Sequence, residues 1–293
     1  MDTALQQTIE LPDYLVKYGS HLYGNFTPES DQDYRGFVIP PNKYLLDSPF
    51  CKFEQSTLPW DNSPDTVIWS FNKFFKMLMK GDPQAFEILH APESHIVKCS
   101  NVGEIMRANK NLFLSMGIHY RIFGYSQSEW RKVRGVSLEP IIRTVDENQI
   151  IDDIRNVFSP DATHMNEVIK LLFNDHERTA KSSTRKLGKK RKEQIEKYGY
   201  CIKSACNTIR LLDQLVELHT THNITFPRHN CNLLKDIKLG KYSYEDCEVM
   251  FNDLKEKVQS LELKCLLPKK CDNKKIENLY FEILNSLEFG IKT

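Results

Sequence analysis

The sequence predicts an α+β fold, with strands and flanking helices in residues 1–105 and a mainly helical domain in residues 106–293. Alternating and β-branched apolar residues in 14–39 and 65–69 are typical of strands, whereas apolar residues recur at helical spacing from about residue 103 onward. A chain of 293 residues is also long enough to bury two cores, which favours two domains.

Composition and charge exclude several classes of protein. Lys and Arg total 40 against 39 Asp and Glu, so the net charge of +1 argues neither for nor against a nucleic-acid partner. No basic N-terminal segment leads into an apolar run, and no apolar stretch approaches the roughly 18 residues of a membrane span, which predicts a cytoplasmic protein without a membrane partner. The eight cysteines include no Cys-x-x-Cys pair and are expected to be free thiols.

The first candidate site lies where a strand turns into a short helix. Apolar residues from Tyr14 lead into Gly19 and Ser20, which are followed by a short helix. Backbone N–H groups at a helix N-terminus and a serine hydroxyl suit a phosphate oxygen. The sequence therefore predicts that Gly19 and Ser20 bind phosphate.

The second candidate site follows the loop after this helix. Asp31 and Asp33 are two residues apart on an extended segment that leads into the apolar residues 37–39, so both side chains leave the same face. Two such carboxylates repel each other unless a cation lies between them, and they can converge on one Mg²⁺ or on a pair about 4 Å apart. A turn with two solvated carboxylates is the alternative interpretation.

Further elements are predicted along the chain. Residues 50–56 can form a strand by alternation, residues 65–69 form a strand, and an amphipathic helix follows with Phe71, Phe74, Phe75 and Leu78 on one face. Gly81 ends that helix, Asp82 caps the next and Pro83 stands in its first turn. Helices are also predicted at 244–262, capped by Ser243, and at 272–287.

The two candidate sites together carry a family resemblance. Gly-Ser, then about ten residues, then Ser-Asp-x-Asp and an apolar strand resembles the nucleotidyltransferases of the DNA polymerase β superfamily. Within it, Gly-Ser-His-x-Tyr-Gly-x-x-Thr-Pro-x-Ser-Asp-x-Asp-Tyr-Arg-Gly in residues 19–36 is similar to the bacterial and phage proteins called YcgL-type predicted nucleotidyltransferases. The resemblance implies a polymerase β-like palm in residues 1–105, closed by the helical domain.

The resemblance also implies a third carboxylate on a strand beside the Asp-x-Asp segment. We assign it to Asp65, which opens the next strand and precedes a helix, with Glu54 as the reserve and a capping role for Asp65 as the alternative. Asp31, Asp33 and Asp65 are then expected to bind Mg²⁺, or Mn²⁺ in its place. Asp65 is expected to activate the acceptor hydroxyl as well.

The helical half supplies further candidates. Lys203 and Arg210 are seven residues apart, hence on one side of a helix, where they can hold triphosphate oxygens. This helix resembles one in the family, although Ser204 and Asn207 stand where the family has histidines. The expected nucleotide-binding residues are Gly19, Ser20, Tyr23, Lys203 and Arg210.

Two other features have competing interpretations. An apolar helical face that includes Tyr120, Phe123 and Tyr125 is interpreted as core rather than as a base-stacking surface, and Glu87 as a surface or capping residue rather than one facing the metal site. Residues 178–192 hold eight Lys and Arg and no acidic residue. They form either a phosphate-backbone contact or a solvated linker.

The expected reaction is transfer of an NMP group from an NTP, with ATP favoured, to a hydroxyl acceptor, with release of pyrophosphate. The favoured acceptor is an RNA 3′ end, which residues 178–192 would hold if they form a phosphate-backbone contact rather than a linker. Two alternatives remain: AMP transfer to a protein side chain, and a nucleotide- or RNA-binding regulator without turnover.

Overall fold

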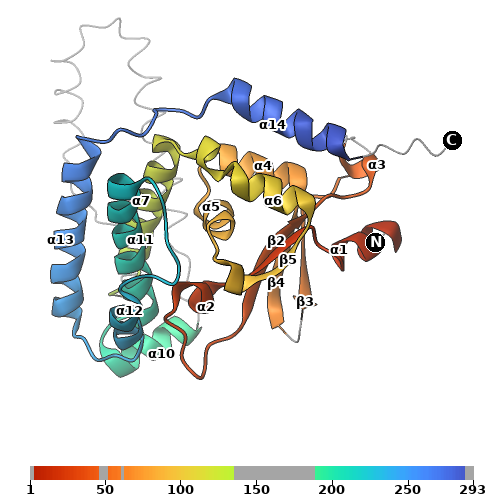
Figure 1. Cartoon of the computed structure of the whole chain (residues 1–293). Coiled ribbons are helices and arrows are strands. Elements are labelled where there is room, and N and C mark those ends of the chain that lie inside the picture. The colour runs from red at the N-terminus through yellow and green to blue at the C-terminus, as the bar shows by residue number, and fades with distance from the viewer. Residues whose placement is uncertain (1–2, 46–51, 61–62, 135–188, 288–293) are drawn as a thin grey trace, which may run out of the picture. The chain divides into compact units, whose positions relative to one another are not determined.

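The computed structural model describes residues 3–45, 52–60, 63–134 and 189–287 (Figure 1). The chain divides into two compact units, one formed by Met1–Glu129 with Ala205–Thr293 and the other by Trp130–Ser204. The first unit thus joins the sheet to helices from the C-terminal third, and its limits differ from the boundary predicted near residue 105. Most of the predicted basic segment, residues 178–188, lies outside the described residues.

A five-stranded sheet lies at the centre of the first unit. Its spatial order is β3-β4-β2-β1-β5, and β2 and β4 are parallel while the other neighbours are antiparallel. This mixed sheet with its many helices confirms the predicted α+β class. The strands are β1 (Tyr14–Tyr18), β2 (Asp33–Val38), β3 (Gln55–Trp60), β4 (Ser63–Ser70) and β5 (Ile96–Cys99).

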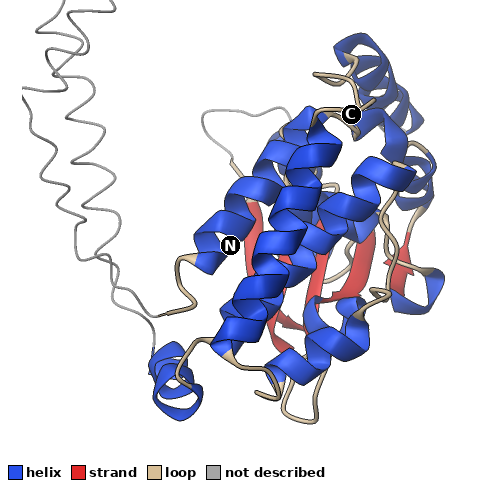
Figure 2. Cartoon of the chain, turned by 90° about the vertical axis from the view of Figure 1, so that its left-hand side faces the viewer, coloured by secondary structure: helices blue, strands red, loops and turns tan. Residues whose placement is uncertain are grey.

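Helices pack on both faces of the sheet (Figures 1 and 2). On one face, Leu15, Tyr34 and Ile68 pack with Leu5 and Ile9 of helix α1 (Thr3–Ile9). On the other face, strand alternation places Tyr14, Tyr18, Asp33 and Phe37, and these residues face α4 (Phe71–Met79) and α5 (Pro83–Leu89). There Phe37 stacks on Phe74, and the Tyr14 hydroxyl donates to the carbonyl of Ile88 (2.8 Å). This second face carries the candidate site.

The predicted helix boundaries agree with the structure where local chemistry sets them. The Asp82 side chain caps α5 by accepting from two backbone N–H groups, and Ser243 forms a capping box with Asp246 at the start of α13 (Tyr244–Glu262). The last described helix is α14 (Asn273–Ser286). The remaining helices are α2 (Gly19–Tyr23), α3 (Asn42–Leu45), α6 (Asn101–Ala108), α7 (Met116–Trp130), α10 (Lys189–Tyr198), α11 (Ile202–Thr221) and α12 (Cys231–Lys238).

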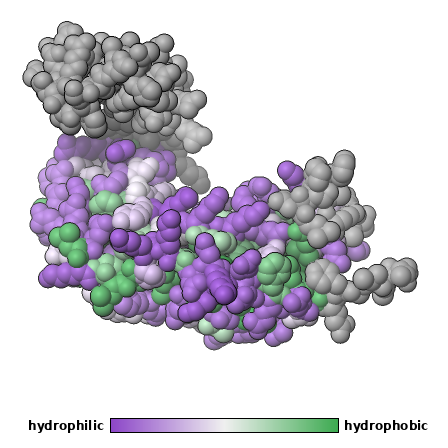
Figure 3. All heavy atoms as spheres, turned by 90° about the horizontal axis from the view of Figure 1, so that it is seen from above, coloured by the Kyte–Doolittle hydropathy of each residue, from purple (hydrophilic) through white to green (hydrophobic). Residues whose placement is uncertain are grey.

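The face of the molecule that Figure 3 presents is mainly polar. Figure 3 shows hydrophilic side chains over most of the face that it presents, with apolar ones scattered among them. None of the helices in the described ranges is long and apolar enough to cross a membrane.

Helix α7 buries a different face from the one predicted. Tyr120 is 60% exposed and Tyr125 is also exposed, whereas Ile118, His119 and Ile122 are buried. The prediction was wrong for Tyr120 and Tyr125, whereas Phe123 is half-buried. His119 is buried on this helix because it has a polar partner there. Its Nδ1 lies 2.8 Å from Nε2 of His219 on α11, so the two rings share a hydrogen bond.

Two buried histidines make stability depend on pH. Burial lowers the pKa of His90 from 6.5 to about 3, and burial and the neighbouring His119 lower that of His219 to about 4. Both are neutral in the folded state, so below pH 6.5 the unfolded chain binds more protons and the free energy of unfolding falls with decreasing pH. For His90 the loss between about pH 7.5 and about pH 5 is about 2 kcal/mol.

Urea denaturation at two pH values measures this effect. We expect a lower midpoint at about pH 5 than at about pH 7.5, and a smaller difference in a His90→Gln variant, whose side chain does not titrate. An equal midpoint at both pH values in the unmodified protein would contradict the burial of neutral histidines.

Candidate active site

The start of α2 lies against the first residue of β2. Tyr18, the last residue of β1, pairs with Asp33. Gly19 follows in the left-handed region with a φ of 63°, and a Cβ atom on it would lie 2.1 Å from Oδ2 of Asp33. Only glycine leaves this space free and adopts this backbone conformation without strain. The Asp33 carboxylate therefore contacts the Gly19 backbone, next to Ser20 in the chain.

Asp65 lies beside Asp33 on the neighbouring strand. Strand β4 runs parallel to β2 with Tyr34 opposite Thr66, so the residues just before them, Asp33 and Asp65, stand at the same end of adjacent strands. The Asp65 side chain is 55% exposed, and its Oδ1 lies 3.3 Å from Nη2 of Arg35. Arg35 leaves the same face of β2 as Asp33. The corner thus holds two carboxylates with one guanidinium bound to the second.

Glu54, the reserve for the third carboxylate, lies at the other end of the sheet. The residue after it pairs with Trp69, close to the last residue of β4, and its carboxylate forms an ion pair with Lys73 (3.2 Å). The strand register therefore separates Glu54 from Asp33. Of the two candidates, Asp65 is the one that the register brings to the glycine corner.

The donor chemistry at this corner fits a divalent ion. Carboxylate oxygens are the ligands that Mg²⁺ and Mn²⁺ prefer, and the missing side chain of Gly19 leaves room for the carboxylate of Asp33. Asp31 is exposed in the loop two residues before β2. Within the described ranges, no group of three or more His, Cys, Asp or Glu side chains could hold a metal ion. The role of Asp31, Asp33 and Asp65 as metal ligands thus stays a prediction.

A buried polar network lies beside the corner. Glu87 of α5 is only 1% exposed and accepts hydrogen bonds from the hydroxyls of Tyr18 and Tyr23, the latter at 2.8 Å. Nη1 of Arg210 on α11 donates to the other Glu87 oxygen (2.7 Å), and its guanidinium lies 3.8 Å from the centre of the Tyr23 ring. One carboxylate therefore binds the residue before α2, the last residue of α2 and a helix far along the chain.

The network changes the interpretation of three residues. Glu87 was predicted as a surface or capping residue, which is wrong, because it is buried and Asp82 caps the helix. Tyr23 and Arg210, predicted to bind nucleotide, are buried against Glu87, and this role stays a prediction. Burial and the charge of Glu87 raise the pKa of Tyr18, and burial raises that of Tyr23, so both hydroxyls remain protonated donors.

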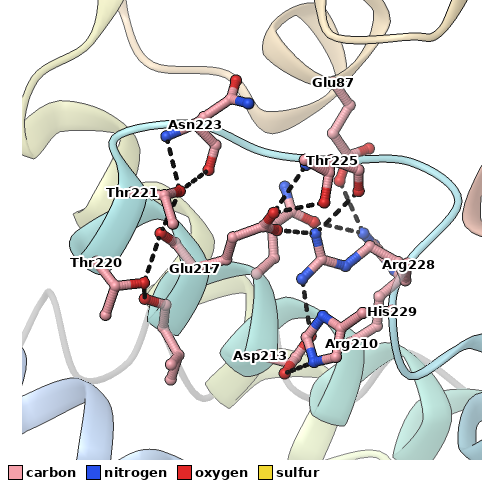
Figure 4. Close-up of polar contacts among 12 residues, drawn as sticks. Glu87, Arg210, Asp213, Glu217, Thr220, Thr221, Asn223, Thr225, Arg228 and His229 are labelled. Atoms are coloured by element: carbon pink, nitrogen blue, oxygen red, sulfur yellow. Dashed lines mark hydrogen bonds and ion pairs between the residues drawn. The ribbon is translucent and has the colours of Figure 1, made fainter.

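A second buried arginine supports the end of α2. Arg228 lies fully inside the protein, where its guanidinium pairs with Asp213 (2.7 Å) and Glu217, both on α11 (Figure 4). Its backbone N–H donates to the carbonyl of Tyr23 (3.1 Å). Nothing in the local sequence around Arg228 predicts this role, because its partners lie on another helix.

Lys203 is placed differently from the other predicted phosphate ligands. It is exposed on the first turn of α11 and belongs to the second compact unit, where its backbone N–H donates to the side chain of Gln194 (3.2 Å). Ser204, which stands where the family has a histidine, is buried, and Asn207 is half-buried. A phosphate-binding role for Lys203 remains a prediction.

A mixed sheet with a glycine corner and carboxylates at the ends of adjacent strands is consistent with a polymerase β-like nucleotidyltransferase. A family model described as RlaP, RNA repair pathway DNA polymerase beta family, matches residues 5–259, and the chain belongs to this family. The predicted resemblance to polymerase β-like nucleotidyltransferases is thus confirmed.

One curated relative is an "uncharacterized 38.9 kDa protein in nrdC-mobD intergenic region" of Enterobacteria phage T4. It is 24% identical over 294 residues, which cover 83% of this chain and 87% of the phage protein. No solved structure matches the chain.

Proposed function

We propose that this protein transfers an NMP group from an NTP, with ATP favoured, to the hydroxyl of an RNA 3′ end, with release of pyrophosphate. The observation that carries the proposal is the contact of the Asp33 carboxylate with the Gly19 backbone. Membership of an RNA repair family of polymerase β type supports both the reaction and the acceptor. In this proposal the five-stranded sheet serves as the palm.

The contact at Gly19 has an electrostatic consequence for phosphate binding. A triphosphate held by the Gly19 backbone and the Ser20 hydroxyl would place its oxygens close to the negative charge of Asp33. Like charges at such separations repel strongly, so we expect NTP binding at this corner to require a divalent cation. Asp31, Asp33 and Asp65 would hold Mg²⁺ or Mn²⁺, which when bound stabilises the attacking and leaving oxygens of phosphoryl transfer.

The remaining polar groups of the corner have roles as well. Asp65 is exposed and lies beside Asp33 in the strand register. We propose that its carboxylate accepts the proton of the acceptor hydroxyl. Arg35 binds the carboxylate and the backbone carbonyl of Asp65, which fixes the start of β4 beside β2. Glu87 would act by holding α2 in place rather than by contacting the reacting atoms, and Arg210, which pairs with Glu87, keeps its proposed role in triphosphate binding.

Transfer of label from NTP tests the proposal. The full chain is incubated with Mg²⁺, each α-labelled NTP in turn, and a mixture of RNA and protein, and a parallel sample contains EDTA. We expect label on RNA, most from ATP, and none with EDTA, because the carboxylates need the cation. Label on protein alone would instead indicate AMP transfer to a side chain. The absence of both label and metal-dependent NTP binding would leave only a regulator without turnover.

A further inference from the structure

The loop that joins the two halves of the corner presents an aromatic pair. Phe26 follows α2 and is 47% exposed, and its ring stacks on His21 with centroids 4.8 Å apart and planes 10° from parallel. His21 immediately follows Ser20, and the same loop leads on to Asp31. An exposed ring pair thus lies within a few residues of both proposed halves of the active site.

The residues on both sides of Phe26 are held by hydrogen bonds. Asn25 is buried, its side-chain amide donates to Sγ of Cys206 on α11 (3.3 Å), and its backbone N–H donates to the carbonyl of Ser20 (3.1 Å). On the other side of Phe26, Thr27 and Ser30 close a turn through reciprocal backbone and side-chain hydrogen bonds. The position of Phe26 is therefore set before any ligand arrives.

Cationic side chains surround the ring pair. Nζ of Lys235 lies 5.7 Å from the centre of the Phe26 ring, and Nζ of Lys238, one helical turn further along α12, binds the carbonyl and side-chain oxygens of Asn25 (3.3 and 3.1 Å). Lys17 adds positive charge near His21. Stacking surfaces flanked by lysines are the usual means of binding single-stranded nucleic acid.

His21 offers a hydrogen-bonding group as well. Its Nε2 is buried and has no hydrogen-bond partner among the described residues. Burial and the nearby positive charges lower the pKa of His21, which keeps the ring neutral at neutral pH. An unpaired buried ring nitrogen is costly unless a ligand or water satisfies it.

We propose that Phe26 and His21, with Lys235 and Lys238, bind a base and the adjacent phosphate of a single-stranded RNA acceptor. The inference rests on the proposed transferase function and names the residues that would hold its acceptor. The triphosphate already has its predicted ligands at Gly19 and Ser20, whereas the lysines of α12 are additional and suit a second chain of phosphates. Unpaired bases are the part of RNA that stacks on aromatic side chains.

Binding to a blocked oligonucleotide tests the inference without requiring turnover. A fluorescein-labelled single-stranded RNA with a 3′-deoxy end is titrated with the full chain in the absence of metal and NTP, and anisotropy is recorded. We expect Phe26→Ala to weaken binding roughly 5- to 100-fold and Phe26→Tyr to retain it, because stacking requires a ring. Lys235→Ala should reduce the dependence of binding on salt concentration.

The matched control is Phe281→Ala, which removes another exposed phenylalanine (52%), on α14. This variant should bind RNA like the unmodified protein. Phe26→Leu keeps the apolar volume without the ring and should bind as weakly as Phe26→Ala, which separates loss of stacking from loss of folding.

Equal RNA affinity of Phe26→Ala and the unmodified protein would overturn the inference. The inference would also be overturned if Phe26→Ala raised the KM for NTP and left the KM for RNA unchanged. The Phe26 ring would then bind the base of the nucleotide. RNA binding that depends on Phe26 in a protein without any transfer activity would support the RNA site and refute only the transferase function.

Discussion

Replacing Glu87 with alanine is expected to lower the free energy of unfolding by about 3 to 5 kcal/mol, as removal of one partner from a buried ion pair typically does. Arg210 would keep a buried positive charge without its carboxylate, and the hydroxyls of Tyr18 and Tyr23 would lose their shared acceptor. The substitution should also loosen α2, because the Glu87 carboxylate binds the residue before this helix, Tyr18, and its last residue, Tyr23.

The matched control is Glu93→Ala. Glu93 also pairs with an arginine, Arg107, at 2.5 Å, but its side chain is 78% exposed. Water screens such exposed ion pairs, so we expect Glu93→Ala to lower the free energy of unfolding by less than about 1 kcal/mol. Urea denaturation of both variants gives the comparison. Similar losses for Glu87→Ala and Glu93→Ala would show that burial does not strengthen the Glu87 network.

Replacing Asp33 with asparagine should reduce nucleotidyl transfer by about a hundredfold or more, since charge stabilisation supplies most of the catalysis in such sites. Asparagine keeps the shape that fits against Gly19, so the thermal midpoint should change little. The initial rate of label incorporation from α-labelled ATP, measured beside thermal unfolding, separates the two effects. A full rate in Asp33→Asn would contradict the proposed site.

Two further variants decide the third carboxylate. Asp65→Asn should reduce the rate strongly, because the register places Asp65 beside Asp33. Glu54→Gln removes a carboxylate from the opposite end of the sheet, where it pairs with Lys73, and should leave the rate close to normal. The reverse result would assign the proton transfer to Glu54 and contradict the role proposed for Asp65.

The sequence predicted the features that depend on residues close together in the chain. The turn at Gly19, the strands on either side of it, and the caps at Asp82 and Ser243 all follow from hydrogen-bonding and backbone preferences within a few residues. The family resemblance also led us to expect the Asp-x-Asp segment close to the glycine corner, and the antiparallel pairing of Tyr18 with Asp33 places Asp33 there.

Only the tertiary structure decided the features that depend on distant partners. Sequence spacing favoured Asp65 and kept Glu54 in reserve, and only the strand register shows which of the two lies beside Asp33, since register is set by pairing across the sheet. An acidic residue between apolar neighbours, Phe86 and Ile88, was a signal of buried charge, but its partner Arg210 is 123 residues away. A polar side chain can be buried only where a hydrogen-bond partner lies next to it. When that partner is distant in the sequence, tertiary packing alone brings the two together.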